Sequence, residues 1–257
     1  MRTSTKLLLG AFVIFVIALM VYNFQLKAEY LTGNYKNPFK NFNKINIDGF
    51  TEVEINGASM MDIELKQGDF LVGKAKYNED SIQFTKAGNR LIVNINLSQK
   101  PVIDSGAEEN ENGRVVRIGP AYRKNRILIS CPKLTSLVTS DSFLVNGKPY
   151  SSSSFFYDIR ETRLSVFKSD SLSLELNSRH KIILNGDIIK SLKATVNRNA
   201  SLSMSGNMFT KANLQINNGA NLTMGNQPVA DLTYRLGDSV NIKLSGVSVK
   251  SFIKQQP

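Results

Sequence analysis

The chain has 257 residues, of which 42% are hydrophobic and 21% are charged, a balance typical of globular proteins rather than disordered ones. A single cysteine and a single histidine exclude an internal disulfide framework and a closed zinc site built from those two residue types. The formal net charge of +11 favours polyanionic surroundings such as anionic glycans, lipid headgroups or nucleic acid.

Near the N-terminus, residues 7–26 form an apolar run long enough to cross a bilayer as a helix. Arg2 and Lys6 precede the run, and positive residues are retained on the cytoplasmic side of membranes. We therefore predict a cytoplasmic tip at residues 1–6, a single-pass transmembrane signal-anchor, and a periplasmic or extracellular location for the rest. The alternative is a cleaved signal peptide, although small residues suitably spaced for cleavage do not follow the run. An anchored domain outside the cytoplasm predicts no nucleic-acid partner.

After the anchor, residues 27–44 are polar, contain Pro38 and indicate a tether without a core of its own. Residues 45–253 show apolar residues at every second position, as in Val53 and Ile55, and this period is that of β-strands. Glycine residues punctuate these runs as turns. We therefore predict an all-β domain over residues 45–253, with a subdivision near the serine-rich residues 149–158.

The C-terminal half carries the most specific pattern of the sequence, in which two apolar residues separated by one residue recur about every ten positions. Asparagine and glycine stand between the pairs and accept the positive φ angles that sharp corners require. The spacing between successive pairs is ten residues, except for one interval of twelve residues that is followed by one of eight. The pairs are Leu172/Leu174, Ile182/Leu184, Leu192/Ala194, Leu202/Met204, Leu214/Ile216, Leu222/Met224, Leu232/Tyr234 and Ile242/Leu244.

Two architectures fit this ten-residue unit. In a β-solenoid, two or more units make one coil of roughly 20 residues, and parallel coils bury the apolar pairs in a central column. In an antiparallel β-sandwich or meander, each Asn-Gly is a hairpin turn. The short strands, the mid-sized aliphatic residues and the recurrence of asparagine where it can stack in ladders favour the solenoid.

Several stretches carry a family resemblance: FNKINIDGFTEVEINGASMMDIELKQGD (Phe42 to Asp69), DSIQFTKAGNRLIVNI (Asp80 to Ile95), and the repeats NRNASLSMSG and NNGANLTMGN. Through them the chain resembles the head GIN domain family, a group described as auto-transporter adhesin heads and common in Bacteroidota. The resemblance covers most of residues 42–245. It implies a right-handed parallel β-helix in an exported bacterial protein, and it supplies no catalytic or binding residues.

Candidate catalytic and metal sites are few. A Ser-His-Asp or Cys-His site would have to use His180, the one imidazole, which we expect to be solvated at the entry to a strand. The acidic residues 104–111 do not match the spacing of a known calcium loop and indicate a solvated loop. We therefore predict no catalytic residues, no metal and no cofactor.

A basic segment follows the acidic loop. It suggests a patch for anionic glycans or lipid headgroups, whereas the alternative is a solvated surface that balances the neighbouring acids or guards a strand edge. The candidate binding residues are Arg114, Arg117, Tyr122, Arg123, Lys124 and Arg126.

Together these patterns predict a non-catalytic, adhesion-like interaction surface at the cell envelope. A second hypothesis is a sensing or scaffold protein that acts with a membrane-protein partner, because six cytoplasmic residues are too few to signal alone. The third is a carbohydrate-active solenoid enzyme.

Overall fold

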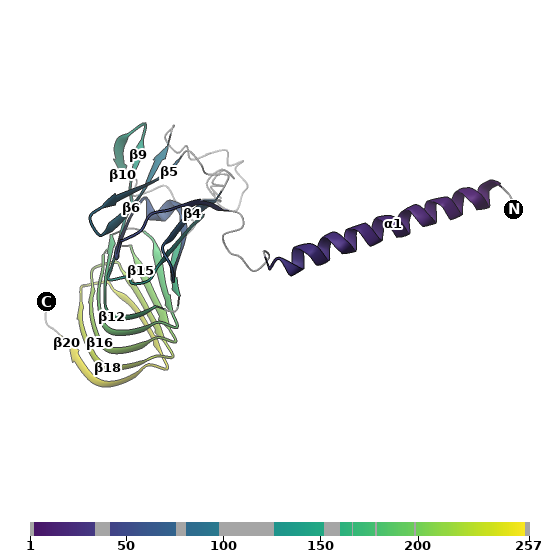
Figure 1. Cartoon of the computed structure of the whole chain (residues 1–257). Helices are drawn as coiled ribbons and strands as arrows, with labels where there is room; N and C mark the ends of the chain where they lie inside the picture. The colour runs from purple at the N-terminus through teal and green to yellow at the C-terminus, as the bar shows by residue number, and fades with distance from the viewer. Residues whose placement is uncertain are drawn as a thin grey trace, which may run out of the picture. The chain divides into compact units, whose positions relative to one another are not determined.

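The structure is a computed structural model, and it describes residues 3–33, 42–75, 81–97, 126–151, 160–165, 167–177, 179–197 and 199–254. The chain divides into two compact units, Met1–Phe42 and Asn43–Pro257. The second is called the β unit below. Figure 1 shows the N-terminal helix of the first unit and the stacked strands of the second.

The first unit contains the helix α1, Thr3–Leu31. Within it, Leu8–Leu31 has a mean hydropathy of 2.1 and is long and apolar enough to cross a membrane, by length and composition alone. A signal sequence near an N-terminus has the same properties. The prediction of an apolar N-terminal helix is confirmed, and the helix extends beyond the expected residues 7–26 at both ends.

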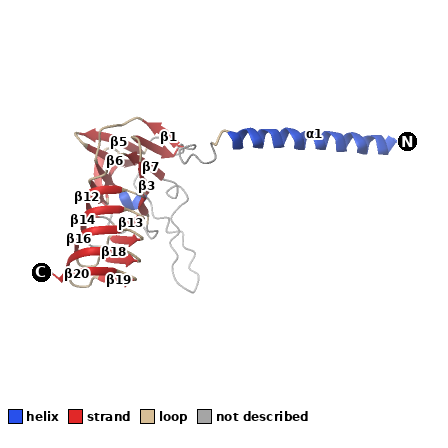
Figure 2. Ribbon diagram, turned by 60° about the horizontal axis from the view of Figure 1, so that its bottom comes forward, coloured by secondary structure: helices blue, strands red, loops and turns tan. Residues whose placement is uncertain are grey.

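The described strands of the β unit form two sheets, and Figure 2 shows them stacked along the unit. Sheet A has nine described strands. In spatial order they are β1 (Phe42–Ile45), β4 (Leu71–Ala75), β7 (Arg126–Cys131), β3 (Asp62–Gln67), β11 (Glu161–Ser165), β13 (Lys181–Asn185), β15 (Ser201–Ser205), β17 (Asn221–Gly225) and β19 (Asn241–Ser245).

Sheet B has eleven strands in the described part of the chain. In spatial order they are β10 (Lys148–Ser151), β9 (Ser142–Val145), β6 (Arg90–Leu97), β2 (Glu52–Asn56), β8 (Ser136–Ser140), β12 (Lys168–Asn177), β14 (Ile188–Val196), β16 (Met208–Ile216), β18 (Pro228–Leu236) and β20 (Ser248–Lys254), with β5 (Ile82–Ala87) paired to β6. A single turn of 3-10 helix, Ala58–Met60, joins β2 to β3.

Each coil of the C-terminal half spans 20 residues and contributes one short strand to sheet A and one longer strand to sheet B. In sheet A, Leu202 pairs with Leu222, and Leu222 pairs with Ile242, 20 residues further on. The pairing is parallel in both sheets. Parallel, solenoid-like stacking is therefore confirmed, and the repeats do not form the antiparallel hairpins of the alternative.

The apolar pairs point inward and form the core, as predicted, with one correction. Leu192 pairs with Ala212 and Ala194 pairs with Leu214, so the fifth inward pair is Ala212/Leu214. Ile216 belongs to a further inward column with Val196. The predicted irregular spacing of twelve and eight residues is therefore wrong. The repeat keeps its ten-residue spacing, with Ala212 as the first member of the fifth pair. All inward pairs from Leu172 to Met224 are buried.

Two corners turn the chain in each coil, and both use the left-handed backbone region. The φ angles are +51° to +72° at the first corner and +56° to +74° at the second. Glycine and asparagine adopt these angles at the lowest cost. The first corner holds Gly186, Gly206, Asn226 and Gly246, and the second holds Asn199, Gly219 and Ser239.

An asparagine ladder runs beside the second corner. Asn197 Nδ2 donates to Asn177 Oδ1, and Asn217 Nδ2 donates to Asn197 Oδ1. These residues are 20 positions apart and occupy the same place in successive coils. The prediction that asparagine stacks in ladders at the corners is confirmed at this position.

The N-terminal part of the β unit builds the same two sheets out of chain order. β8 lies between β2 and β12 in sheet B, and β3 lies between β7 and β11 in sheet A. Antiparallel pairs occur at this end, namely β4 with β7, β5 with β6, and β9 with β10. Their inward side chains, such as Val72 and Phe143, are buried and cover this end of the stack.

Candidate binding surfaces of the β unit

The predicted basic patch lies mostly outside the described residues. Of its six members, the structure describes Arg126, which is the first residue of β7 and is exposed. The patch as a whole stays a prediction. The surroundings of Arg126 show what kind of surface this end of β7 belongs to.

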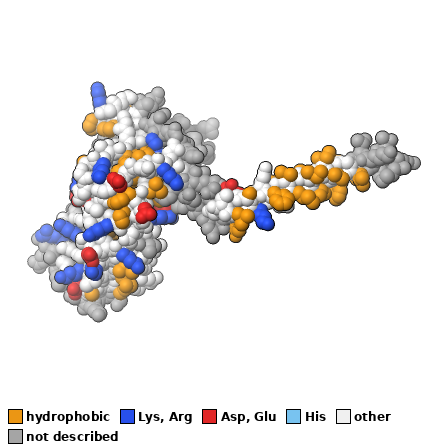
Figure 3. Space-filling view, in the orientation of Figure 1, with side chains coloured by type: hydrophobic (Ala, Val, Ile, Leu, Met, Phe, Trp, Pro, Cys, Tyr) orange, Lys and Arg blue, Asp and Glu red, His pale blue; other side chains and the backbone are white. Residues whose placement is uncertain are grey.

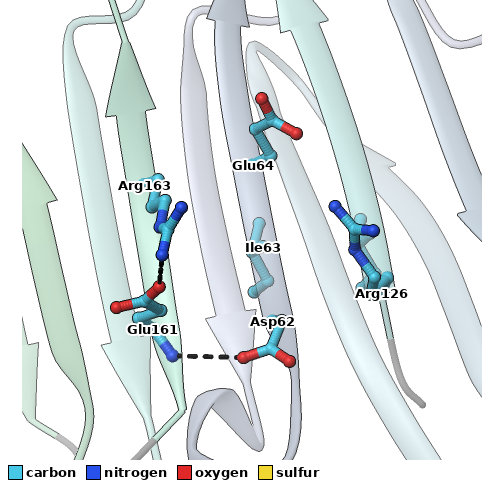
Figure 4. A pocket seen from close by; sticks show the side chains of 7 residues that line it. Asp62, Ile63, Glu64, Arg126, Glu161 and Arg163 are labelled. Atoms are coloured by element: carbon cyan, nitrogen blue, oxygen red, sulfur yellow. Dashed lines mark hydrogen bonds and ion pairs between the residues drawn. The ribbon is translucent and has the colours of Figure 1, made fainter. Parts of the chain in front are cut away.

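Arg126 lines a hollow on the outer face of sheet A, with a volume of about 580 Å³. The neighbouring strands β3 and β11 contribute Asp62, Glu64, Glu161 and Arg163 to it (Figure 4). Asp62 is the direct cross-strand neighbour of Arg126. The hollow therefore mixes acidic and basic side chains and is not a purely basic surface.

The acids of this hollow already have cationic neighbours. Arg160 Nη1 lies 3.1 Å from Asp62 Oδ2, Arg163 forms an ion pair with Glu161, and Lys66 Nζ lies 2.8 Å from Glu64 Oε1. These pairs are partly solvent-exposed and so contribute little to stability. Their effect on binding is to neutralise the local charge, which disfavours the hollow as a site for anions or for metal ions.

A second hollow lies further along sheet A, over the regular coils. It is a groove of about 480 Å³ and runs across β13, β15, β17 and β19. We call it the polar groove. Its lining consists of Arg179, His180, Lys181, Asn199, Ser201, Ser203, Asn221, Leu222, Thr223, Asn241 and Lys243.

The charge of the polar groove is one-sided. None of the described residues that line it is acidic, and Arg179, Lys181 and Lys243 are cationic. Just outside this lining, Glu161 of β11 is the direct cross-strand neighbour of Lys181, and it is paired with Arg163. Figure 3 shows lysine and arginine side chains spread over the visible face of the β unit, with a few acidic side chains among them.

The regular coil positions the polar side chains of the groove. The inward members of β15, Leu202 and Met204, are buried, so Ser201 and Ser203 alternate to the outer face. Neighbouring strands lie about 4.8 Å apart, so Lys181 and Lys243, three strands apart, are separated by about 14 Å along the stack. Hydroxyl and amide groups fill the positions between the two lysines.

His180 is buried, with a relative exposure of 1%, and the expectation that it is solvated is wrong. It occupies the inward column that Ala200 and Ala220 occupy in the next coils, which explains its burial. Its Nε2 lies 2.6 Å from Thr162 Oγ1, and Nδ1 has no hydrogen-bond partner. Burial lowers the pKa of His180 to about 3, so the ring is neutral at physiological pH. The buried, neutral ring is therefore a poor candidate for acid or base chemistry on a ligand in the groove.

A second polar ladder lies inside the first corner. Asp187 Oδ1 accepts a hydrogen bond from the Phe167 backbone N–H at 2.7 Å, and Asn207 Oδ1 accepts one from the Asp187 N–H at 2.9 Å. Asn207 Nδ2 donates to Gln227 Oε1 at 3.3 Å. Asp187 Oδ2 has no partner, and burial raises the pKa of this carboxyl to about 6. The ladder holds the corner together.

Two further observations bear on chemistry. Among the described residues, no group of three or more His, Cys, Asp or Glu side chains is placed to hold a metal ion. Cys131 is fully buried, and burial raises the pKa of its thiol to about 12, which makes it a poor nucleophile.

The comparisons with known proteins give fold-level likenesses only. No family model matches the chain, and no curated protein matches it. A putative adhesin from Bacteroides fragilis aligns with 83% of this chain and 95% of its own, at 10% identity and a TM-score of 0.46. A putative lipid binding protein from Parabacteroides distasonis aligns with 83% of this chain and 96% of its own, at 14% identity and a TM-score of 0.35. A putative adhesin from Parabacteroides merdae aligns with 82% of this chain and 95% of its own, at 11% identity and a TM-score of 0.34.

Membership of the head GIN domain family stays a prediction. The polar groove was missed by the sequence analysis. The signal that could have found it is the 20-residue register, which brings Lys181, Ser201, Asn221 and Asn241 into one column of the sheet.

Proposed function

We propose that the chain is an exported, membrane-anchored interaction protein whose β unit, a right-handed parallel β-helix, binds anionic glycans through the polar groove. α1 serves as the anchor and holds the β unit outside the cytoplasm. The protein binds its ligand without a chemical step. This role is adhesion-like.

The single observation that supports the glycan ligand is the acid-free lining of the polar groove. Its cations can pair with sulfate or carboxylate groups of a glycan, and its serine, threonine and asparagine side chains can hydrogen-bond sugar hydroxyls. The net charge of +11 adds long-range attraction for a polyanion. A rigid β face holds these groups in place before binding, which lowers the entropic cost of association.

Binding to a panel of polysaccharides tests the proposal, with the full chain held in detergent micelles. Heparin and polygalacturonate represent sulfated and carboxylated glycans, and dextran is the neutral control. We expect saturable binding to one or both polyanions, none to dextran, and weaker binding as the salt concentration rises. Lys181→Gln is expected to weaken binding about fivefold, because it removes one charge-assisted contact.

The matched control is Lys193→Gln, which removes an exposed lysine from the outer face of sheet B and should leave the affinity unchanged. Equal binding by the two variants would remove the groove from the proposal. Binding of glycerol phosphate in place of glycans would reassign the groove to lipid headgroups. Release of reducing ends from any polysaccharide would replace the proposal with a carbohydrate-active enzyme.

A further inference from the structure

The two ends of the stack differ. At the N-terminal end, Val72 of β4 and Phe143 of β9 are buried beneath the end strands β1 and β10, and Ile45 of β1 is half-buried. At the C-terminal end, Leu244 lies in the same inward column as the buried Met224, yet it is 51% exposed. Ile242 and Val247 are only partly buried. Solenoid ends have to be covered to keep the central column dry. Among the described residues, the last coil leaves its apolar end partly uncovered.

The same end presents unpaired backbone. Among the described strands, β19 pairs with β17 alone and β20 pairs with β18 alone. The Asn241 N–H donates to Ala220 O, and Ser245 O accepts from the Asn226 N–H, so both residues bond toward the preceding coil. Residues alternate in direction along a strand, and Ile242 and Leu244 therefore direct their N–H and C=O groups to the open edge. A further strand can be added there.

The charge of the residues near this edge determines which kind of added strand would bind favourably. Residues 240–257 contain three lysines and no acidic residue. On β19, Lys243 faces outward between the inward-facing Ile242 and Leu244. An added strand that complements this pattern places apolar side chains inward over the open end of the core and an acidic side chain outward beside Lys243.

We propose that the open edge of β19 captures an extended segment of a partner protein in which acidic and apolar residues alternate. The segment extends sheet A by main-chain hydrogen bonds to Ile242 and Leu244 and covers the end of the core. A second copy of this chain is a poorer occupant. Two β19 edges paired antiparallel would bring their lysines at position 243 side by side, and like charges directly opposite are destabilising.

A synthetic peptide of four Glu-Val repeats, acetylated and fluorescently labelled, is the probe, and its anisotropy is measured with the full chain in detergent micelles. Empty micelles and a Lys-Val peptide of the same length are the controls. We expect saturable binding of the Glu-Val peptide and at least tenfold weaker binding of the Lys-Val peptide, about the effect of reversing several cross-strand charges. N-methylation of alternate residues in the Glu-Val peptide should abolish binding, because it removes the main-chain hydrogen bonds without changing the protein.

Two variants separate the edge from the polar groove. Leu244→Pro removes an N–H that the fold does not use, and proline is tolerated at such edge positions. It should weaken binding of the Glu-Val peptide at least about tenfold, because the ring blocks strand addition. Lys181→Gln, in the polar groove, should leave peptide binding unchanged.

Binding of the Glu-Val peptide that survives N-methylation would overturn the proposal, and so would failure of that peptide to bind. Sedimentation of the full chain provides the remaining test. A dimer that Leu244→Pro converts to monomer would assign the edge to a second copy and would also overturn the acidic partner. Leu244 is not among the residues that line the polar groove. These outcomes therefore do not decide whether the groove binds glycans, which the polysaccharide panel tests separately.

Discussion

At the scale of single residues, the buried carboxyl group of Asp187 lowers the stability of the fold at neutral pH. Its folded pKa of about 6 lies above the ordinary value of 3.8, because burial disfavours the charged form. The fold therefore holds its proton more tightly than the unfolded chain does. As the pH rises from about 4 to about 6, this carboxyl lowers the free energy of unfolding, and above pH 6 the whole penalty is present.

Asp187→Asn is expected to stabilise the β unit at pH 7 by roughly 1–3 kcal/mol, the energy equivalent of the shift. The asparagine of the next coil shows how the new amide can be satisfied, since Asn207 Nδ2 donates to Leu184 O at 3.0 Å. The equivalent acceptor for residue 187 is Leu164 O, one coil earlier. Chemical denaturation at pH 7 and pH 4 measures the effect, and the gain should vanish at pH 4. A gain of equal size at both pH values would point to packing instead of charge.

At the scale of single elements, the asparagine ladder ties successive corners together. Asn197 is its central member and both donates to and accepts from its neighbours. Asn197→Ala removes both hydrogen bonds and is expected to lower the free energy of unfolding by about 1–2 kcal/mol, since one such bond is worth about 1 kcal/mol or less when partly exposed.

Denaturant titration of the full chain measures this loss. The matched control is Asn213→Ala, which replaces an exposed asparagine on the outer face of sheet B and should change the free energy of unfolding by less than about 0.5 kcal/mol. Equal losses in the two variants would show that the ladder bonds contribute nothing.

The elements of the regular coils were largely predictable from sequence. Alternation identified the inward pairs such as Leu202/Met204, and asparagine and glycine identified the corners. Two residues misled the interpretation. Ala212 is too small to mark an inward position by its hydrophobicity alone, and His180 is a polar residue in a column that is otherwise small and apolar. In both cases the 20-residue register, rather than the residue type, determines burial.

At the scale of the whole β unit, local periodicity could not predict the strand order of the N-terminal part. β8 enters between β2 and β12, which are separated from it by long stretches of chain. The polar groove and the open edge of β19 could not be predicted from local periodicity either, because both depend on which strands lie side by side. A period of two reports which face a residue occupies, but it carries no information on neighbours across the sheet.

Because each coil of the regular region contacts only its neighbours, stability should decline toward the uncovered end. Hydrogen exchange of the full chain, followed by mass spectrometry, is expected to show the least protection in β19, more in β17 and more again in β15. The physical reason is that Leu244 is half exposed, whereas Met224 and Met204 are buried. Uniform protection across the three strands would contradict an open end, and added Glu-Val peptide should raise the protection of β19 first.

The unbroken 20-residue register has a consequence for how such a protein can change in length. Ala200 and Ala220 hold identical positions, so removing residues 201–220 would join two equivalent points of the backbone without a seam. Insertion of a duplicate of that segment would be equally smooth. Length can therefore vary in whole multiples of one turn, while the first and last turns, and whatever each of them binds, stay as they are.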